Sequence, residues 1–157
     1  MTADDLHLLR LEFASCAVAP AQASPAGHPV LAQAAAWLDN YFSGSRPDPL
    51  DLPTDPRGTF FQKTVWKAVL EVGYGQTSSY GAIANKIGTR SARAVGGAIA
   101  RNPLAIVIPC HRILMGSGKI CGYAWGTPIK QWLLWHEGAL STACKESYLS
   151  ATTKARG

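Results

Sequence analysis

Helix start and stop signals follow one another closely between residues 59 and 103, so this part of the chain is restricted to short helices joined by tight turns. Thr59 and Gln62 form a capping box that opens the first helix, which ends at Gly73. A short capped helix is predicted for SSYGAIANKIG, residues 78–88. Ser91 caps a third helix, which ends before Pro103 because the residue before a proline avoids the helical region.

The second and third of these helices are separated only by a glycine-containing turn, which is the arrangement of a helix-turn-helix. In that motif the second helix is presented to DNA. This helix contains Gly96 and Gly97, and each glycine costs about 1 kcal/mol relative to alanine. Two interpretations of the glycines stay open at this point: close packing between helices, or close approach to a nucleic-acid backbone.

The distribution of charge favours a polyanionic partner. Residues 1–55 contain seven acidic and two basic residues, whereas residues 56–112 contain eight basic residues and one acidic residue. An isolated run of charge is usually a solvated face. This basic segment leads directly to Cys110, however, and we interpret it as a surface for nucleic acid.

The N-terminal third carries weaker signals. Apolar and polar residues alternate over residues 6–13, which predicts one half-buried strand with Leu9, Leu11 and Phe13 on a single face. Pro29 opens a predicted helix over residues 30–42. The apolar stripe of that helix is Leu31, Ala34, Ala35, Leu38 and Phe42. The proline- and glycine-rich residues 43–58 mark a domain boundary near residue 55.

We therefore expect an α/β protein in three parts. A reduced, β-containing N-terminal part spans residues 1–55, a mainly α domain with a winged helix-turn-helix-like DNA-binding motif spans residues 56–138, and a loose extension spans residues 139–157. The N-terminus carries acids where a signal peptide carries bases, and no apolar run reaches the roughly 18 residues that span a bilayer. We expect a cytoplasmic monomer whose four cysteines are free thiols.

The apolar stretch LAIVI, residues 104–108, predicts a short buried strand that Pro109 ends. Because the chain leaves the strand there, the thiol of Cys110 and the imidazole of His111 can cooperate. An imidazole works best as a base when a carboxylate holds its other nitrogen. Glu137 closes the helix predicted to start at Thr127, so the sequence predicts a relay of Cys110, His111 and Glu137.

Other interpretations of this segment stay open. A lone cysteine is more often buried and inert, and a Cys–His–Glu relay also fits a cysteine hydrolase. Arg112 can bind phosphate, or it can tie its loop to backbone carbonyls or to Glu137. A zinc site of Cys110, His111, Cys121 and His136 has spacings that match no common zinc pattern, so we expect no metal.

The residues RAVGGAIARNPLAIVIPCHRI, followed by GYAWG and LLWHEG, resemble the C-terminal domain of the O6-alkylguanine-DNA alkyltransferases, also called methylated-DNA–protein-cysteine methyltransferases. The resemblance runs from Arg57 to Gly138. It implies that Cys110 accepts an alkyl group from O6 of a guanine flipped out of double-stranded DNA, with O4-alkylthymine as a further candidate lesion. It also implies one irreversible reaction per molecule without a cofactor.

The resemblance implies roles for further residues on the DNA side. Arg93 fills the gap in the base stack left by the flipped guanine, and Tyr80 helps to rotate the nucleotide. Asn102 holds the turn between the helix and the active-site segment. The small residues that let this helix approach the minor groove closely are Ala92, Ala94 and Gly96.

The same resemblance implies a base pocket. Tyr80 meets the base edge, Tyr123 forms a wall, and backbone groups near Ala124 with the carbonyls of Cys110 and Ile113 read the guanine. Trp125 stands where many members have glycine. Its indole either packs against the last helix or narrows the pocket against large alkyl groups.

The family usually has a more extensive β-rich N-terminal domain, so the resemblance implies that residues 1–55 are a reduced or truncated version of it. The main alternative function is a lesion sensor or DNA-binding regulator that transfers nothing. Non-transferring relatives lack the cysteine, so the presence of Cys110 argues against this alternative.

The resemblance also implies that His111 and Glu137 complete the site, as a relay linked to Cys110 through a water molecule.

Overall fold

The computed structural model describes residues 1–13 and 27–140 of the chain. Its elements in chain order are β1 (Thr2–Ala3), β2 (Leu8–Arg10), α1 (Pro29–Phe42), the 3-10 helix η1 (Pro49–Asp51), α2 (Phe60–Leu70), β3 (Ser78–Ser79), α3 (Tyr80–Lys86), α4 (Ala92–Ile99), the 3-10 helix η2 (Cys110–Arg112), β4 (Ile113–Leu114) and α5 (Thr127–His136). This mixture of helices and short strands confirms the α/β class. None of the described helices is both long and apolar enough to cross a bilayer.

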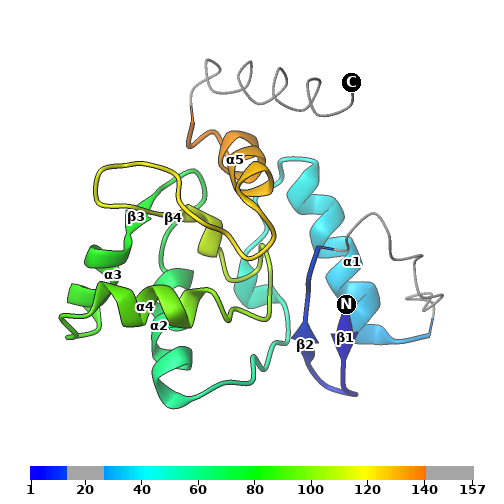
Figure 1. The fold of residues 1–157 in the computed structure, drawn as a ribbon. Helices are drawn as coiled ribbons and strands as arrows, with labels where there is room; N and C mark the ends of the chain where they lie inside the picture. The colour runs from blue at the N-terminus through cyan, green and yellow to red at the C-terminus, as the bar shows by residue number, and fades with distance from the viewer. Residues whose placement is uncertain (14–26, 141–157) are drawn as a thin grey trace, which may run out of the picture.

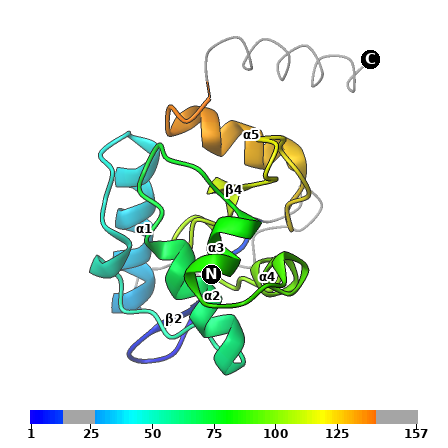
Figure 2. The same cartoon turned by 90° about the vertical axis from the view of Figure 1, so that its left-hand side faces the viewer.

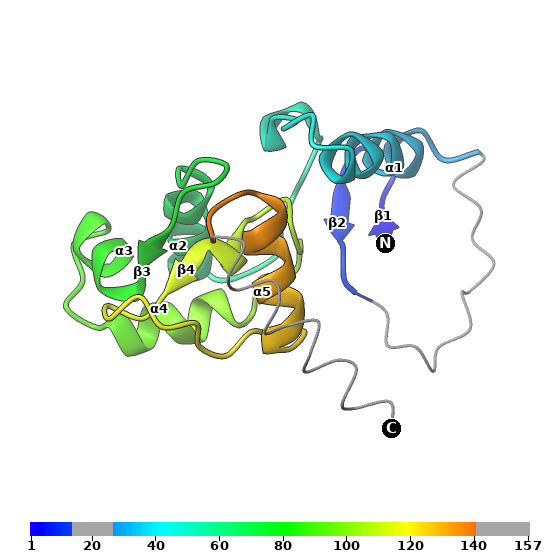
Figure 3. The same ribbon diagram turned by 90° about the horizontal axis from the view of Figure 1, so that it is seen from above.

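The elements form two groups on either side of α5 (Figures 1 and 3). Helix α1 and the antiparallel pair β1–β2 lie on one side, and α2, α3, α4 and the parallel pair β3–β4 lie on the other. One cluster of buried side chains runs through both groups; it includes Leu8, Trp37, Trp66, Leu104 and Leu133. The two groups therefore share a hydrophobic core.

The predicted helix signals are confirmed between residues 59 and 103. Thr59 and Gln62 form both hydrogen bonds of the capping box, at 3.2 and 2.8 Å. Ser79 and Ser91 cap α3 and α4, each accepting a main-chain N–H three residues later at 3.1 Å. Gly88 ends α3 with φ +73°, a conformation that glycine adopts without a steric cost. Helices α3 and α4 pack on each other, and Figure 2 faces this helix-turn-helix.

The predicted strand over residues 6–13 is wrong in length and in face. Strand β2 spans only Leu8–Arg10, and the buried residues are Leu8 and Leu11 rather than Leu9 and Phe13. The main chain of Leu8 bonds to Pro53, and that of Leu11 bonds to Pro103 and Ala105. Because these contacts with distant segments determine which side chains are buried, burial does not alternate from residue to residue along this segment.

Helix α1 starts at Pro29 as expected, but most of its buried residues lie one position earlier in the chain than those of the predicted apolar stripe. The buried residues are Val30, Ala34, Trp37 and Tyr41. Trp37 donates its indole N–H to the carbonyl of Asp48 at 2.8 Å, and Tyr41 donates to a carboxylate described below. The two large aromatic side chains are buried because their polar atoms find partners there.

The prediction of a strand at residues 104–108 is wrong, although all five residues are buried. The segment is a compact turn in which Ile106 has φ +67° and Ile108 N–H bonds to the carbonyl of Leu104 at 3.0 Å. Continuous apolar sequence predicts burial, but it does not distinguish an extended segment from a folded one. The turn brings Cys110 back towards the end of α4.

Candidate active site

Cys110 begins the 3-10 helix η2, directly after Pro109. The chain turns at this proline, as expected, and buries Cys110, His111 and Arg112 together. Only 3% of Cys110 is exposed, yet its side chain lines a cavity of about 380 Å³. The thiol is therefore shielded from bulk solvent but accessible from this cavity.

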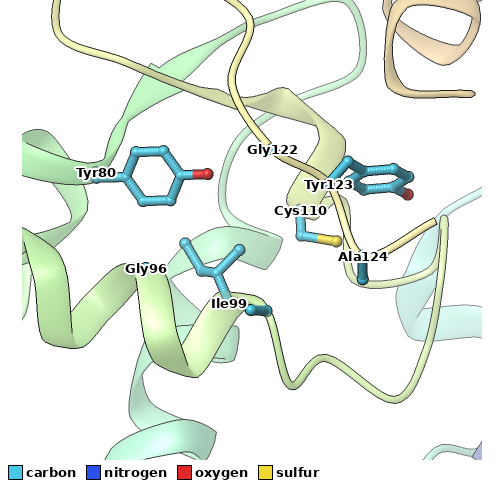
Figure 4. A pocket seen from close by; sticks show the side chains of 8 residues that line it. Tyr80, Gly96, Ile99, Cys110, Gly122, Tyr123 and Ala124 are labelled. Atoms are coloured by element: carbon cyan, nitrogen blue, oxygen red, sulfur yellow. The ribbon is translucent and has the colours of Figure 1, made fainter. Parts of the chain in front are cut away.

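The cavity lies between helix α4 and the loop at residues 122–124 (Figure 4). Its lining residues are Tyr80, Gly96, Ile99, Ala100, Cys110, Gly122, Tyr123 and Ala124. Of these, Tyr80, Tyr123 and Ala124 were predicted as pocket residues. Ile99, Ala100 and Gly122 were missed because no local pattern marks a residue as facing a cavity.

Asn102 occupies the hinge position between α4 and the active-site turn. Its Nδ2 donates to the carbonyl oxygens of Leu104 and Ile108, at 3.3 and 2.9 Å, and to Sγ of Cys110 at 3.0 Å. Its Oδ1 accepts the N–H of Leu104 at 2.9 Å. One buried amide thus joins the end of the helix, the turn and the thiol.

The thiol of Cys110 is protonated at rest. Burial raises the pKa of this thiol, and the hydrogen bond from Asn102 and the positive charge of Lys130 offset only part of that effect. The thiol is therefore not a nucleophilic thiolate in the absence of a base.

The residue that follows Cys110, His111, carries an imidazole. It is fully buried, and its Nε2 lies 2.8 Å from Oε1 of Glu137. Burial lowers the pKa of His111 more than the carboxylate raises it, so the imidazole is neutral. Since the carboxylate accepts, Nε2 carries the proton and the opposite nitrogen, Nδ1, is the acceptor. Among the residues described, no group is bonded to the buried Nδ1.

Glu137 is the C-cap of α5 and a buried anion with several donors. Arg112 donates from Nε to Oε2 at 2.7 Å and from Nη2 to Oε1 at 2.9 Å. Burial on its own raises the pKa of Glu137, but the hydrogen bonds from His111 and Arg112 lower it to about 2. Arg112 also donates to the carbonyl of Val72. Of the two roles left open for Arg112, the structure therefore shows the one that ties the loop to Glu137.

Two buried residues that bond to Glu137 or to the active-site segment were not identified from the sequence. Tyr41 of α1 donates its hydroxyl to Oε1 of Glu137 at 2.7 Å. Lys130 of α5 is fully buried and donates from Nζ to the carbonyl of Ile113 at 2.6 Å. Lys130 lies three, four and seven residues before Leu133, Leu134 and Glu137, and this helical spacing is the signal that could have found it.

Helix α4 exposes Ala92, Arg93 and Ala94 at its start. Gly96, one turn later, is half-buried, and a β-carbon added to it would lie 3.7 Å from the ring of Tyr80. That is an ordinary van der Waals distance, so a methyl group would fit there and the packing of this helix on Tyr80 does not require a glycine. The hydroxyl of Tyr80 accepts a hydrogen bond from Sγ of Cys121 at 3.4 Å.

Two predicted pocket residues do not line the cavity. The side chain of Ile113 is fully buried, and its carbonyl already accepts from Lys130. The carbonyl of Cys110 accepts the N–H of Ile113. Trp125 packs against Tyr123, which lines the cavity, and does not line the cavity itself. Its ring lies 5.2 Å from that of Tyr123 and 5.9 Å from that of Phe13.

The zinc interpretation does not fit the observed geometry. His111 is bonded to Glu137, the Nε2 of His136 lies 2.9 Å from the carbonyl of Tyr41, and Cys121 is bonded to Tyr80. Over residues 1–13 and 27–140, no group of three or more His, Cys, Asp and Glu side chains could hold a metal ion. Cys16 and Cys144, which are also expected to be free thiols, lie outside the described residues.

Residues 60–139 match a family model described as the DNA-binding domain of 6-O-methylguanine DNA methyltransferase. A methylated-DNA–protein-cysteine methyltransferase of Methanosarcina acetivorans is 47% identical over 108 residues, which cover 68% of this chain and 69% of that protein. The protein of the same name from Methanosarcina barkeri is 52% identical over 103 residues, which cover 65% of each chain.

Two solved structures are similar to the chain. One is OGT of Mycobacterium tuberculosis in complex with DNA, with 47% identity and a TM-score of 0.65 over 68% of this chain and 65% of that one. The other is a variant of the O6-methylguanine methyltransferase of the same organism. It has 38% identity and a TM-score of 0.74 over 88% of this chain and 85% of that one.

Proposed function

The chain belongs to the O6-alkylguanine-DNA alkyltransferase family, and from that premise we propose that it repairs DNA by moving an alkyl group from O6 of guanine onto its own Cys110. The observation that carries the proposal is the position of Cys110, which lines a cavity beside α4 and directly precedes His111, whose imidazole is bonded to the carboxylate of Glu137. We further propose that it acts as a cytoplasmic monomer and without a cofactor.

In the proposed reaction the relay first removes the thiol proton. Nδ1 of His111 takes the proton from Cys110 through a water molecule, and Glu137 stabilises the imidazolium. The thiolate attacks the alkyl carbon, so a C–S bond forms as the bond to guanine O6 breaks. Guanine leaves with a proton, and the thioether remains. No group of the relay can hydrolyse a C–S bond, so each molecule reacts once.

The alkylated oxygen lies within the base stack of duplex DNA, so the nucleotide must rotate out before it reaches the thiol. The exposed start of α4 supports this step, because Arg93 is free to enter the duplex between the small residues Ala92 and Ala94. Tyr80 and Tyr123 line the cavity from opposite sides (Figure 4). Burial and the neighbouring thiol raise the pKa of Tyr123, so this wall stays an uncharged phenol.

The stoichiometry of transfer tests this function. We expect duplex DNA with radiolabelled O6-methylguanine to transfer one methyl group per protein molecule, in a burst without later turnover. Peptide mapping should place the added methyl group on Cys110. Repeated turnover would instead indicate a cysteine hydrolase, and binding without a mass change would indicate a sensor or regulator.

Trp125 provides a prediction about alkyl size. The indole of Trp125 packs against the ring of Tyr123, so Trp125→Gly should let the Tyr123 ring move. We expect this change to speed the reaction of benzylguanine relative to that of methylguanine by about tenfold. The rates of both substrates with wild type and variant measure this ratio. Trp135→Gly in α5 changes an indole outside the cavity lining and serves as the control. An unchanged ratio in Trp125→Gly would show that the indole only packs.

A further inference from the structure

We propose that Tyr41, on helix α1 of the N-terminal part, is a positioning residue of the relay: its hydroxyl shares the carboxylate of Glu137 with His111 and so keeps His111 uncharged as the pH falls. This inference rests on the function proposed above. It adds a fourth member to the relay, contributed by a part of the chain outside the family-matched residues 60–139.

The geometry places three donors on one oxygen atom. Oε1 of Glu137 accepts the hydroxyl of Tyr41 at 2.7 Å, Nε2 of His111 at 2.8 Å and Nη2 of Arg112 at 2.9 Å. Tyr41 is only 2% exposed, and its ring stacks on that of Trp37 with centroids 5.8 Å apart. The hydroxyl is thus held in place from within α1.

The hydroxyl of Tyr41 is uncharged and acts as a donor to Glu137. Burial raises the pKa of Tyr41, and the negative charge of Glu137 raises it further. A hydrogen bond between a hydroxyl and a carboxylate is also among the stronger bonds in proteins. Tyr41 therefore stabilises the anionic form of Glu137 without adding a charge of its own.

The groups around His111 fix the sign of the effect. Glu137 at the end of α5 favours the imidazolium, whereas Arg112 beside it and Lys130 within α5 disfavour it. Cys110 precedes His111 in the chain. Two further phenols, Tyr74 and Tyr123, interact electrostatically with Glu137. Donors that share one oxygen compete for its charge. Removal of the Tyr41 hydroxyl leaves more of that charge to His111, which then protonates at higher pH.

A protonated His111 cannot accept the thiol proton, so the change appears in the acid limb of the rate profile. For Tyr41→Phe we expect the acid limb of the single-turnover transfer rate to move up by about one pH unit, with each variant normalised to its own plateau. The matched control is Tyr74→Phe. Its hydroxyl is also near Glu137 but donates to the carbonyl of His136 at 3.3 Å, so its acid limb should stay at the wild-type position.

A second variant covers the case in which Tyr41→Phe does not fold. Fluorotyrosine placed at position 41 keeps the ring and makes the hydroxyl a stronger donor, so the acid limb should move down. A residue that only supports packing would change the plateau rate or the stability without moving the limb. If the acid limb of either folded Tyr41 variant coincides with that of wild type, the proposal for Tyr41 is wrong. If wild type itself transfers no alkyl group, the proposed function fails first.

Discussion

Replacing Cys110 with serine is expected to abolish alkyl transfer, by at least about a thousandfold, while binding of duplex DNA persists. A serine hydroxyl can still accept the hydrogen bond from Asn102, so the hinge stays intact. Its proton, however, is far too tightly held for the neutral imidazole of His111 to remove. The label transferred per mole of protein and the dissociation constant for duplex DNA measure the two effects separately.

Cys121→Ser is the matched control for this experiment. Cys121 is the other free thiol in the described part of the chain, and it lies beside Tyr80 rather than in the cavity lining. We expect this variant to accept one full equivalent of methyl group. Transfer that survives in Cys110→Ser but disappears in Cys121→Ser would show that Cys121 is the acceptor. That result would overturn the proposed function.

The second large effect is expected for Glu137→Gln, which leaves the guanidinium of Arg112 buried without its counterion. Breaking a buried ion pair from one side typically destabilises a protein by about 3 to 5 kcal/mol. The amide also presents a donor to His111, so the histidine loses the orientation that leaves Nδ1 free. We expect both the free energy of unfolding and the transfer rate to fall.

Urea unfolding at neutral pH measures the stability, with Glu71→Gln as the control. Glu71 pairs with Lys86 at 2.6 Å, but both side chains are about half exposed. Exposed pairs of this kind contribute about 0 to 1 kcal/mol. Equal losses in the two variants would show that the burial of Glu137 has no energetic consequence.

The pH dependence of this stability has a definite sign. The pKa of Glu137 is lowered from 4.5 to about 2 in the folded protein. A lowered carboxyl pKa contributes stability that is complete above the unfolded value and is lost as the pH falls towards the folded one. The wild-type advantage over Glu137→Gln should therefore shrink between pH 4.5 and about 2.

Local signals account for what the sequence predicted well. The caps Thr59, Ser79 and Ser91 act within three residues, so the helices they begin can be located from the sequence alone. The hydrogen bond between His111 and Glu137 was also predictable, because few acids follow Cys110 and one closes a clear helix. Its role in transfer stays a prediction.

Contacts between distant segments account for what was missed. Tyr41 lies 96 residues from Glu137, and nothing in the pattern of α1 marks its hydroxyl as a partner of that carboxylate. The turn at residues 104–108 depends on Leu11 and Asn102, whose bonds to it are not visible in an apolar run. Trp125 was placed in the pocket by its position in the loop, whereas Phe13 and Tyr123 hold its ring behind the wall.

The amide of Asn102 connects the proposed alkyl transfer to the stability of the fold around the thiol. Before reaction its Nδ2 bonds to the sulfur of Cys110 and to the carbonyls on which the active-site turn is built. A thioether is a poor acceptor and is bulkier than a thiol, so under the proposed function we expect an alkyl group on Cys110 to weaken the joint between α4 and the turn. We expect the alkylated protein to open locally at this joint more readily than the unreacted protein.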